Sequence, residues 1–442
     1  MISRELKIAT SVSVLFAVLY IYYDIPWGLM DDYKWIVRTE EFLSNPFSSY
    51  LDFQKYMIGK GTIQPFIHLQ YIIQYIPGIY ISPLFTHIEN IFILIFIHFC
   101  LYKVFAQKLR INYLFSLTIF LIFPYTYDLF LLPSLQEKFS IPLFSYLIYK
   151  LEKNRNSSRN SILDIFLISF SIPLIKLQGS VFILFVICYY LIHRTKSAQF
   201  SILGFAFSIS LQAYLLFFTN SGYYVLEKTA KQIINNLQSI QNLLFILIIF
   251  IGLFFALFEK NKETKIYIFG LGLSSLAIIF ILINWDSYGY LYSFYAFFIC
   301  LFVPYIIRFV LEAINIPILE NFISLVLIGL TLMSINLFFL PRAERWSDLN
   351  YVYTVLDNNK LDQEIYYCGS EGVLTFNNLN QSKNEIQFAG NFSDIKSRSF
   401  YLISDDLQCN YLEDELVSTC NATVPFVSKY NRMEIKKYSC NS

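Results

Sequence analysis

Two adjacent carboxylates, Asp31 and Asp32, follow the first apolar run of the chain and lie between Trp27 and Trp35. Because tryptophan rings concentrate at the membrane–water interface, the pair is expected at a membrane surface. A carboxylate held there can act as a general base that takes a proton from a hydroxyl group. The same acids can also do no more than keep a loop soluble or cap a helix. The pair is therefore the candidate catalytic site, with a structural role as the alternative.

Further polar side chains occur next to long apolar runs. Burying them in a bilayer would be costly, so they indicate function. On the topology given below they gather at the same membrane surface as the acidic pair. Carboxylates among them would serve proton transfer, and cations would bind a phosphate group. The candidate substrate-binding residues are Glu137, Lys138, Lys176, Gln178, Asp286, Tyr288, Arg342 and Arg345.

Several of these candidates also have a purely structural explanation. Glu137 and Lys138 can form an ordinary pair on the protein surface. Lys176 can lay its aliphatic chain along the membrane and keep its ammonium group in water. Arg342 and Arg345 can anchor the end of the last helix at headgroup level. Both explanations stay open at these positions.

The seven cysteines divide by context into two groups. Those in apolar runs are Cys100, Cys188 and Cys300, and those in the polar C-terminal stretch are Cys368, Cys409, Cys420 and Cys440. An even cluster in a polar tail favours disulfides and an oxidising compartment. Cys420 and Cys440 flank a predicted hairpin symmetrically, which favours that pair and leaves Cys368 with Cys409. The other two connectivities stay open, and zinc is an alternative that no C-x-x-C spacing supports.

The sequence gives no sign of nucleic-acid binding or of a metal centre. The net charge is +1 and the chain has no basic stripe, so nucleic acid is not an expected partner. The four histidines show no metal-ligand spacing. The chain also lacks the G-x-S-x-G, Walker and dinucleotide-binding motifs. No metal ligands are therefore predicted from the residues.

The composition predicts a polytopic α-helical membrane protein. Of the 442 residues 56% are hydrophobic and only 15% are charged, whereas soluble domains carry roughly 25% charged residues. Arg4 and Lys7 precede an apolar run at 8–23 that lacks a cleavage site, so we expect an uncleaved first helix that starts in the cytoplasm. Basic clusters recur at every second connection. The pattern predicts about eleven spans, with the N-terminus inside and the C-terminus outside.

Two segments are expected on the outer side. Residues 24–89 form a long first outer loop within a transmembrane domain at 1–340. Its apolar half, 66–85, is broken by prolines and is expected to form helices lying in the interface. A true span there would invert the topology of everything downstream. Residues 341–442 are expected to form a small extracytoplasmic α/β or mostly β domain, with a helix near 346–356 and strands at 364–368, 399–403 and 433–438.

This layout resembles the GT-C superfamily of integral membrane glycosyltransferases. The features that match are the uncleaved first helix, the outer loop with Asp31 and Asp32 soon after that helix, and interfacial helices before the second span. An odd number of spans and an outer C-terminal domain also match. Within the superfamily the chain looks most like the serotype-converting O-antigen glucosyltransferases of the Gtr type. Trp285 to Gly289 echoes the WWDYG motif of oligosaccharyltransferases, but it has an inserted serine and lies between spans, so it is discounted.

The resemblance implies an activity, its partners and a cell compartment. Such enzymes move a sugar from a polyprenyl-phosphate donor to an acceptor on the outer face, here a hexose such as glucose to lipid-linked O-antigen. An acid of the first outer loop is the general base, which falls on Asp32 or Asp31, with Asp32 preferred. Some relatives use a divalent metal and others do not. The implied location is the inner membrane of a bacterium, with the C-terminal domain in the periplasm.

Other functions fit parts of the sequence. An O-antigen polymerase also joins lipid-linked sugars outside, but it usually carries its large outer loops between spans. A transporter or flippase tends to have repeated halves and broken helices at the bilayer midplane, and we find no repeat here. A receptor would use the outer domain and leave the acids as scaffolding. These alternatives remain beside glycosyl transfer.

Overall fold

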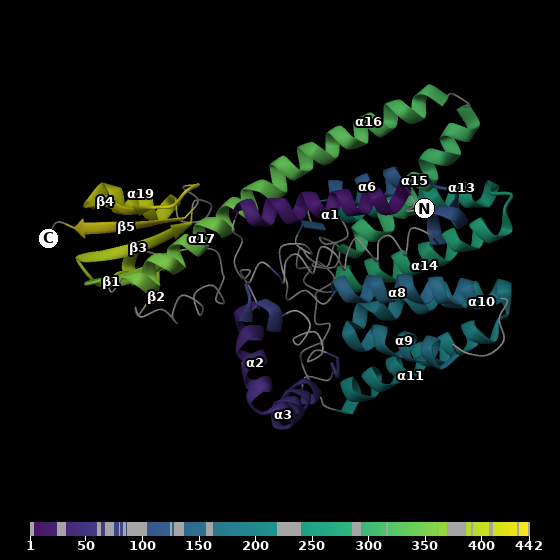
Figure 1. Cartoon of the computed structure of the whole chain (residues 1–442), viewed down its shortest axis with the longest axis horizontal. Helices are drawn as coiled ribbons and strands as arrows, with labels where there is room; N and C mark the ends of the chain where they lie inside the picture. Colours follow the sequence, from purple (N-terminus) through teal and green to yellow (C-terminus); the bar gives the residue numbers. More distant parts are fainter. Residues whose placement is uncertain are drawn as a thin grey trace.

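The structure is a computed structural model of the whole chain. It describes the chain except for residues 1–3, 24–31, 60–62, 67–74, 79, 83–84, 86–103, 124–125, 128–136, 156–161, 219–239, 285–292, 315–316, 360, 369–385, 390–391, 406–409, 431–432 and 441–442. A bundle of apolar helices forms one end of the molecule, and a small sheet with flanking helices forms the other (Figure 1).

The bundle consists of long apolar helices. Among the described residues, four segments are long and apolar enough to cross a membrane: Lys196–Leu215, Lys262–Ile281, Phe294–Ile314 and Leu319–Leu356. Shorter apolar helices cover Thr10–Tyr23, Tyr113–Ile122, Ile162–Ile175, Leu177–His193 and Asn242–Phe258. The protein is thus an α-helical protein with candidate membrane spans and a small C-terminal sheet, whereas the total of about eleven spans stays a prediction.

The helices of this bundle are named here in chain order. They are α1 (Arg4–Tyr23), α6 (Tyr113–Ile122), α8 (Glu137–Lys153), α9 (Ile162–Ile175), α10 (Phe182–His193), α11 (Lys196–Phe218), α13 (Ile240–Phe258), α14 (Lys262–Asn284), α15 (Ser293–Ile314) and α16 (Pro317–Ser334). Aromatic rings fill the space between them. Phe144 of α8, for example, stacks on Phe182 of α10 with ring centroids 3.8 Å apart.

One end of the bundle carries a network of ion pairs. Lys108 Nζ lies 2.9 Å from a carboxylate oxygen of Glu152 in α8 and 2.9 Å from one of Glu263 in α14. Arg155, which follows α8, lies 2.6 Å from the other oxygen of Glu263. Burial alone would lower the pKa of Lys108, but its hydrogen bonds to Glu263 and Glu152 raise it. We call this end of the bundle the basic end.

Two more connections reach the basic end. Arg308 of α15 pairs with Glu259, which lies between α13 and α14, and donates to the Leu109 carbonyl at 2.8 Å. Asn112 donates to Glu320, at the start of α16, at 2.8 Å. The chain therefore returns to one end of the bundle at alternate connections, which is the arrangement that the spacing of the basic clusters predicts.

Close contact of small residues joins α9 to α11. Ser169 and Ser201 share a hydrogen bond of 2.7 Å across the two helices. A Cβ atom added at Gly204 would lie 2.5 Å from the Phe166 carbonyl oxygen, so the two backbones are in direct contact there. Small residues permit this kind of approach between membrane helices.

The last apolar helix continues into the C-terminal domain without a break. A π-helical segment, η4 (Ile335–Phe339), joins α16 to α17 (Leu340–Asn358). Its Leu340 N–H bonds to the Ile335 carbonyl, and α-helical register resumes at Leu340. Pro341 then lies in the first turn of α17, where proline is tolerated. The polar C-terminal stretch thus begins inside a helix rather than in a loop.

The C-terminal domain is a five-stranded sheet in the order β2-β1-β3-β5-β4. Its strands are β1 (Glu364–Cys368), β2 (Ile386–Phe388), β3 (Ser399–Asp405), β4 (Cys420–Val427) and β5 (Met433–Cys440). β1 pairs in parallel with β2 and β3, and β5 runs antiparallel to β3 and β4. The domain also holds a short 3₁₀ turn, η5 (Phe392–Asp394). Three of the five strands lie where the sequence predicts them.

Both faces of the sheet are covered by a helix. Side chains alternate along a strand, so Ile365 and Tyr367 face one side while Tyr366 and Cys368 face the other. The first side packs on α17, and the second packs on α19 (Asn410–Thr419) through Leu412 and Leu416. The domain is therefore a three-layer α/β structure.

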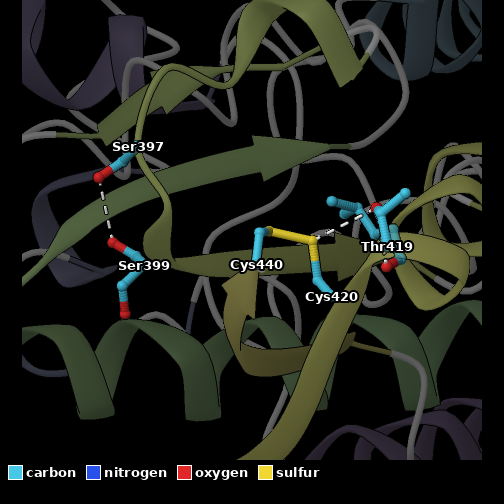
Figure 2. The surroundings of a disulfide bond; sticks show 6 residues. Ser397, Ser399, Thr419, Cys420 and Cys440 are labelled. Carbon is cyan, nitrogen blue, oxygen red and sulfur yellow. Dashed lines mark hydrogen bonds between the residues drawn. A yellow bond between two sulfur atoms is a disulfide. The ribbon is translucent and has the colours of Figure 1, made fainter. Parts of the chain in front are cut away.

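A disulfide joins Cys420 to Cys440, the two cysteines that the sequence analysis pairs (Figure 2). They lie opposite each other at the ends of β4 and β5, with Cα atoms 4.0 Å apart. Cys368 is also disulfide-bonded, whereas Cys409 lies outside the described residues. Of the other described cysteines, Cys188 and Cys300 are free thiols in the helical bundle.

Two helices of the first loop, α2 (Asp32–Ser44) and α3 (Pro46–Gly59), follow α1. Figure 1 shows α2 running across the direction of α1. The sequence analysis placed interfacial helices at 66–85, and most of that segment lies outside the described residues. The helices at 32–59 were not predicted.

Two glutamines tie this loop to the bundle. Gln54 of α3 donates to the Gln64 carbonyl at 3.0 Å and accepts from the Gln64 N–H at 3.3 Å. Gln212 of α11 makes the same pair of bonds with Ile63, at 3.1 and 3.3 Å. Each side-chain amide thus satisfies both backbone groups of one residue, as a neighbouring strand would. The loop is thereby fixed to α11 near the end of that helix.

Candidate functional site

Those predicted site residues that begin α8 or precede α10 lie at the end of the bundle opposite the basic end. α8 runs from Glu137 toward the basic end, and α10 runs from Phe182 to His193, which lies within electrostatic reach of Arg155 there. The start of α8 and the turn before α10 therefore lie at the opposite end. α1 ends on that side as well, next to the C-terminal domain (Figure 1). We call this the tail end of the bundle.

The last residues of α1 contact the C-terminal domain directly. The ring centroids of Tyr23 and Tyr430 lie 5.5 Å apart. Lys429 Nζ lies 4.8 Å from the ring centroids of both Tyr22 and Tyr430, and a cation over an aromatic face is attracted by the ring. Glu344 of α17 lies within electrostatic reach of Tyr23. Three parts of the chain, α1, α17 and the connection after β4, thus meet at the tail end.

The acidic pair comes between α1 and α2. Asp31 lies outside the described residues, and Asp32 is the first residue of α2. Acidic residues are generally favoured at the start of a helix. This location suits a structural role as well as a catalytic one, so both explanations in the sequence analysis remain.

Lys176 and Gln178 lie at a break between two apolar helices. Lys176 has an extended backbone conformation and precedes a 3₁₀ turn, η1 (Leu177–Val181), which leads into α10. Gln178 is only 4% exposed, and its Oε1 has no hydrogen-bond partner among the described residues. Non-helical backbone at membrane depth occurs where it is buried in protein or lines a cavity. The turn therefore offers a buried amide and a half-buried cation to a polar ligand.

The packing around Gly179 holds this turn against α9. A Cβ atom added at Gly179 would lie 2.7 Å from the Ile172 side chain and 3.0 Å from its carbonyl oxygen. On the other side, Ser274 of α14 donates to the Val181 carbonyl at 3.0 Å. The position of Gln178 is thus fixed by contacts on both sides of it.

Arg342 and Arg345 lie in the first turns of α17, beside the end of α1. Both side chains are half-buried. Burial raises the pKa of Tyr367 in β1, and the nearby Arg345 guanidinium partly offsets this effect. These arginines therefore sit where the bundle meets the C-terminal domain, rather than free on a surface.

The remaining candidates are less fully described. Glu137 and Lys138 are the first two residues of α8 at the tail end. Asp286 and Tyr288 lie outside the described residues. The structure thus places Arg342 and Arg345 on α17, a helix that contacts α1, and it places Lys176 and Gln178 in a separate turn between α9, α11 and α14.

Sequence reasoning missed the residues that join α1 to the C-terminal domain. These are Tyr22, Tyr23, Asp348, Lys429 and Tyr430. A partial signal was available, since tyrosines at the end of an apolar run indicate the membrane interface. Nothing in the local sequence around Lys429 and Tyr430 indicates their distant partners.

Among the described residues no group of three or more His, Cys, Asp or Glu side chains could hold a metal ion. No protein-family model matches the chain, and a search of curated proteins found no significant match.

Proposed function

We propose that this protein is an integral membrane glycosyltransferase. It would move a hexose such as glucose from a polyprenyl-phosphate donor to a lipid-linked polysaccharide of the O-antigen type. The reaction would take place on the periplasmic face of a bacterial inner membrane, with the N-terminus in the cytoplasm. The acidic pair would supply the general base, with Asp32 preferred.

The observation that supports this proposal is the contact between the end of α1 and the C-terminal domain. Tyr23 packs on Tyr430, and α2 begins with Asp32. The helix that precedes the acidic segment in the chain therefore contacts the disulfide-bonded domain at its last residue. A disulfide is typical of an oxidising compartment outside the cytoplasm. An acid on that side is where transfer from a lipid-linked donor requires it.

The chemistry is a single displacement at the sugar. The carboxylate takes the proton of the acceptor hydroxyl, whose oxygen forms the new bond to the anomeric carbon. The bond to the lipid phosphate breaks, and the phosphate leaves with its electron pair, so the anomeric centre is inverted. Positioned proton transfer contributes about 10²–10⁴-fold to such a rate.

Cations would stabilise the departing phosphate. Lys176 is the first candidate because it lies two residues before the buried Gln178, and Arg342, Arg345 and Lys138 are the others. Glu137, Asp286 and Tyr288 would contact the acceptor. A divalent metal is compatible with this chemistry, and the mechanism requires none.

The test is sugar addition by single variants expressed in cells that make the acceptor. Asp32→Asn is expected to abolish the hexose increment in the mass of the surface polysaccharide, and Asp31→Asn is its partner variant. Asp52→Asn is the matched control, because Asp52 is an exposed acid of the same loop. Full activity of both pair variants would remove the catalytic assignment. A changed chain length would indicate polymerisation, and an unchanged polysaccharide would favour transport or a receptor role.

A further inference from the structure

Helix α3 is covered on one side by other parts of the first loop. Phe53 and Gln54 are the residues that the helix buries. The Arg38 guanidinium carbon of α2 lies 4.7 Å from the centroid of the Phe53 ring. The Gln54 amide holds both backbone groups of Gln64. One side of α3 therefore faces protein, and its exposed side chains lie on the rest of its circumference.

Two large apolar side chains form an exposed strip beside the buried side of α3. Phe47 is 77% exposed and Leu51 is 39% exposed. They are one turn apart, so they lie on the same side of the helix. Ile58, two turns beyond Leu51, is half-buried on the same strip. Contact of such a strip with water is unfavourable, so a cover of apolar material is expected over it.

Polar side chains form a second exposed strip, next to the first. Ser48, Asp52 and Lys55 are exposed, and their spacing places them on one side of the helix. Lys55 Nζ lies 3.3 Å from Asp52 Oδ1, so the two charges pair with each other. Around the axis of α3, the side that faces protein is followed by the apolar strip and then by the polar strip. This order is typical of a helix that lies in the surface of a membrane.

The side-chain amides of the first loop and of α11 fix the level of α3 along the bundle. Gln212 lies in the last turn of the candidate span Lys196–Leu215 and holds Ile63. Gln64, the next residue, is held by Gln54 of α3. Because α11 runs from the basic end to the tail end, this level is the tail-side boundary of the span. Figure 1 accordingly shows α3 beside the end of α11, outside the bundle.

The outer surface of α11 is apolar up to the same level. Phe207 and Tyr214 are exposed two turns apart, on one side of this helix. Tyrosine near the end of a span is typical of the membrane–water interface. The membrane around α11 therefore ends close to the level of Gln212, which is the level at which α3 is held.

We infer that α3 lies in the tail-side membrane interface and that Phe47 and Leu51 insert among the lipids there. The bilayer covers the apolar strip, and the polar strip faces water. Because Asp52 and Lys55 neutralise each other, the contact depends on apolar area and needs no anionic lipid. It holds the first loop against the membrane whatever reaction the protein carries out, so this inference goes beyond the proposed glycosyl transfer.

The inference is tested on the full-length protein reconstituted into phosphatidylcholine vesicles. The environment-sensitive fluorescent amino acid Anap is introduced as Phe47→Anap, and Ser48→Anap is the matched control on the polar strip. Quenching is measured with spin-labelled phosphatidylcholine, and separately with iodide present on both sides of the bilayer. Spin-labelled lipid is expected to quench position 47 several-fold more strongly than position 48, and iodide should show the reverse order. Leu51→Anap should behave like Phe47→Anap.

The same measurement distinguishes the other possible covers of the apolar strip. Quenching of position 47 by iodide and not by spin-labelled lipid would place the strip in water and overturn the inference. Weak quenching of position 47 by both reagents would mean that protein covers the strip, from a second copy or another segment, and would overturn it too. Equal quenching of positions 47 and 48 by the lipid would contradict the order of the two strips.

Discussion

Gly204→Ala tests the tight packing of α9 on α11. The added methyl group would lie 2.5 Å from the Phe166 carbonyl oxygen, 3.0 Å from Ser169 Cβ and 3.1 Å from the Phe170 N–H nitrogen. Two of these three atoms belong to the backbone of α9. A backbone atom cannot rotate away as the end of a side chain can. The two helices must therefore separate to admit the methyl group.

Two opposing effects set the size of the change. Alanine is favoured over glycine in a helix interior by about 1 kcal/mol. Overpacking costs about 1–3 kcal/mol, and the backbone contacts place Gly204 toward the upper part of that range. The difference is a net loss of about 1–2 kcal/mol in the free energy of unfolding. Separation of α9 and α11 would also weaken the bond between Ser169 and Ser201.

Gly329→Ala is the matched control. Gly329 lies within α16, and a Cβ atom added there meets nothing within 4 Å. The same substitution should therefore raise stability, by up to about 1 kcal/mol. Both variants are purified in detergent, and their unfolding is followed by circular dichroism on heating and on titration with a denaturing detergent. If Gly204→Ala is as stable as Gly329→Ala, the direct backbone contact between α9 and α11 is wrong.

Two other predictions concern the basic end and the topology. Partial burial alone would raise the pKa of Glu259, but hydrogen bonds from the Asn261 N–H and from Arg308 outweigh it and lower the pKa. The stability that this group contributes is therefore present above the ordinary glutamate pKa and is lost as the pH falls through the lowered value. In melting curves between pH 7 and pH 3, Glu259→Gln should melt lower than wild type at pH 7 and lose less stability on acidification, while the exposed Glu40→Gln should follow wild type. Identical acid profiles for Glu259→Gln and wild type would refute this. For the topology, Val417→Cys on the exposed face of α19 should react with a membrane-impermeant maleimide in intact cells, and Lys153→Cys at the basic end should react only after permeabilisation. The reverse pattern would place the C-terminal domain in the cytoplasm.

Local sequence patterns were sufficient to predict those features that depend only on residues close together in the chain. Short runs of strand-forming residues with turn residues between them predicted β1, β3 and β5. In β1 the apolar run is continuous because both faces are covered, with Tyr366 and Tyr367 buried on opposite sides. The symmetric placement of Cys420 and Cys440 about a hairpin indicated their pairing, since opposite residues of two antiparallel strands are close enough for a disulfide. The basic clusters predicted which connections share one end of the bundle.

The tertiary structure decided the features that depend on distant partners. In the sequence Pro341 indicates the end of a helix. In the structure a π-helical segment precedes it, α-helical hydrogen bonding resumes at Leu340, and the helix continues into α17. Gln54 and Gln212 show no local sign that they bind backbone groups of Ile63 and Gln64.

The contact between the first helix and the C-terminal domain likewise depends on partners that are distant in the sequence. Tyr23 and Tyr430 are separated by almost the whole chain, and they meet because α1, α17 and the β4–β5 hairpin converge at the tail end. The sequence by itself determined the residue types on each helix and strand, because burial and periodicity act over a few residues. Which of these surfaces meet was decided by packing among all the elements, because such contacts depend on the positions of several segments at once.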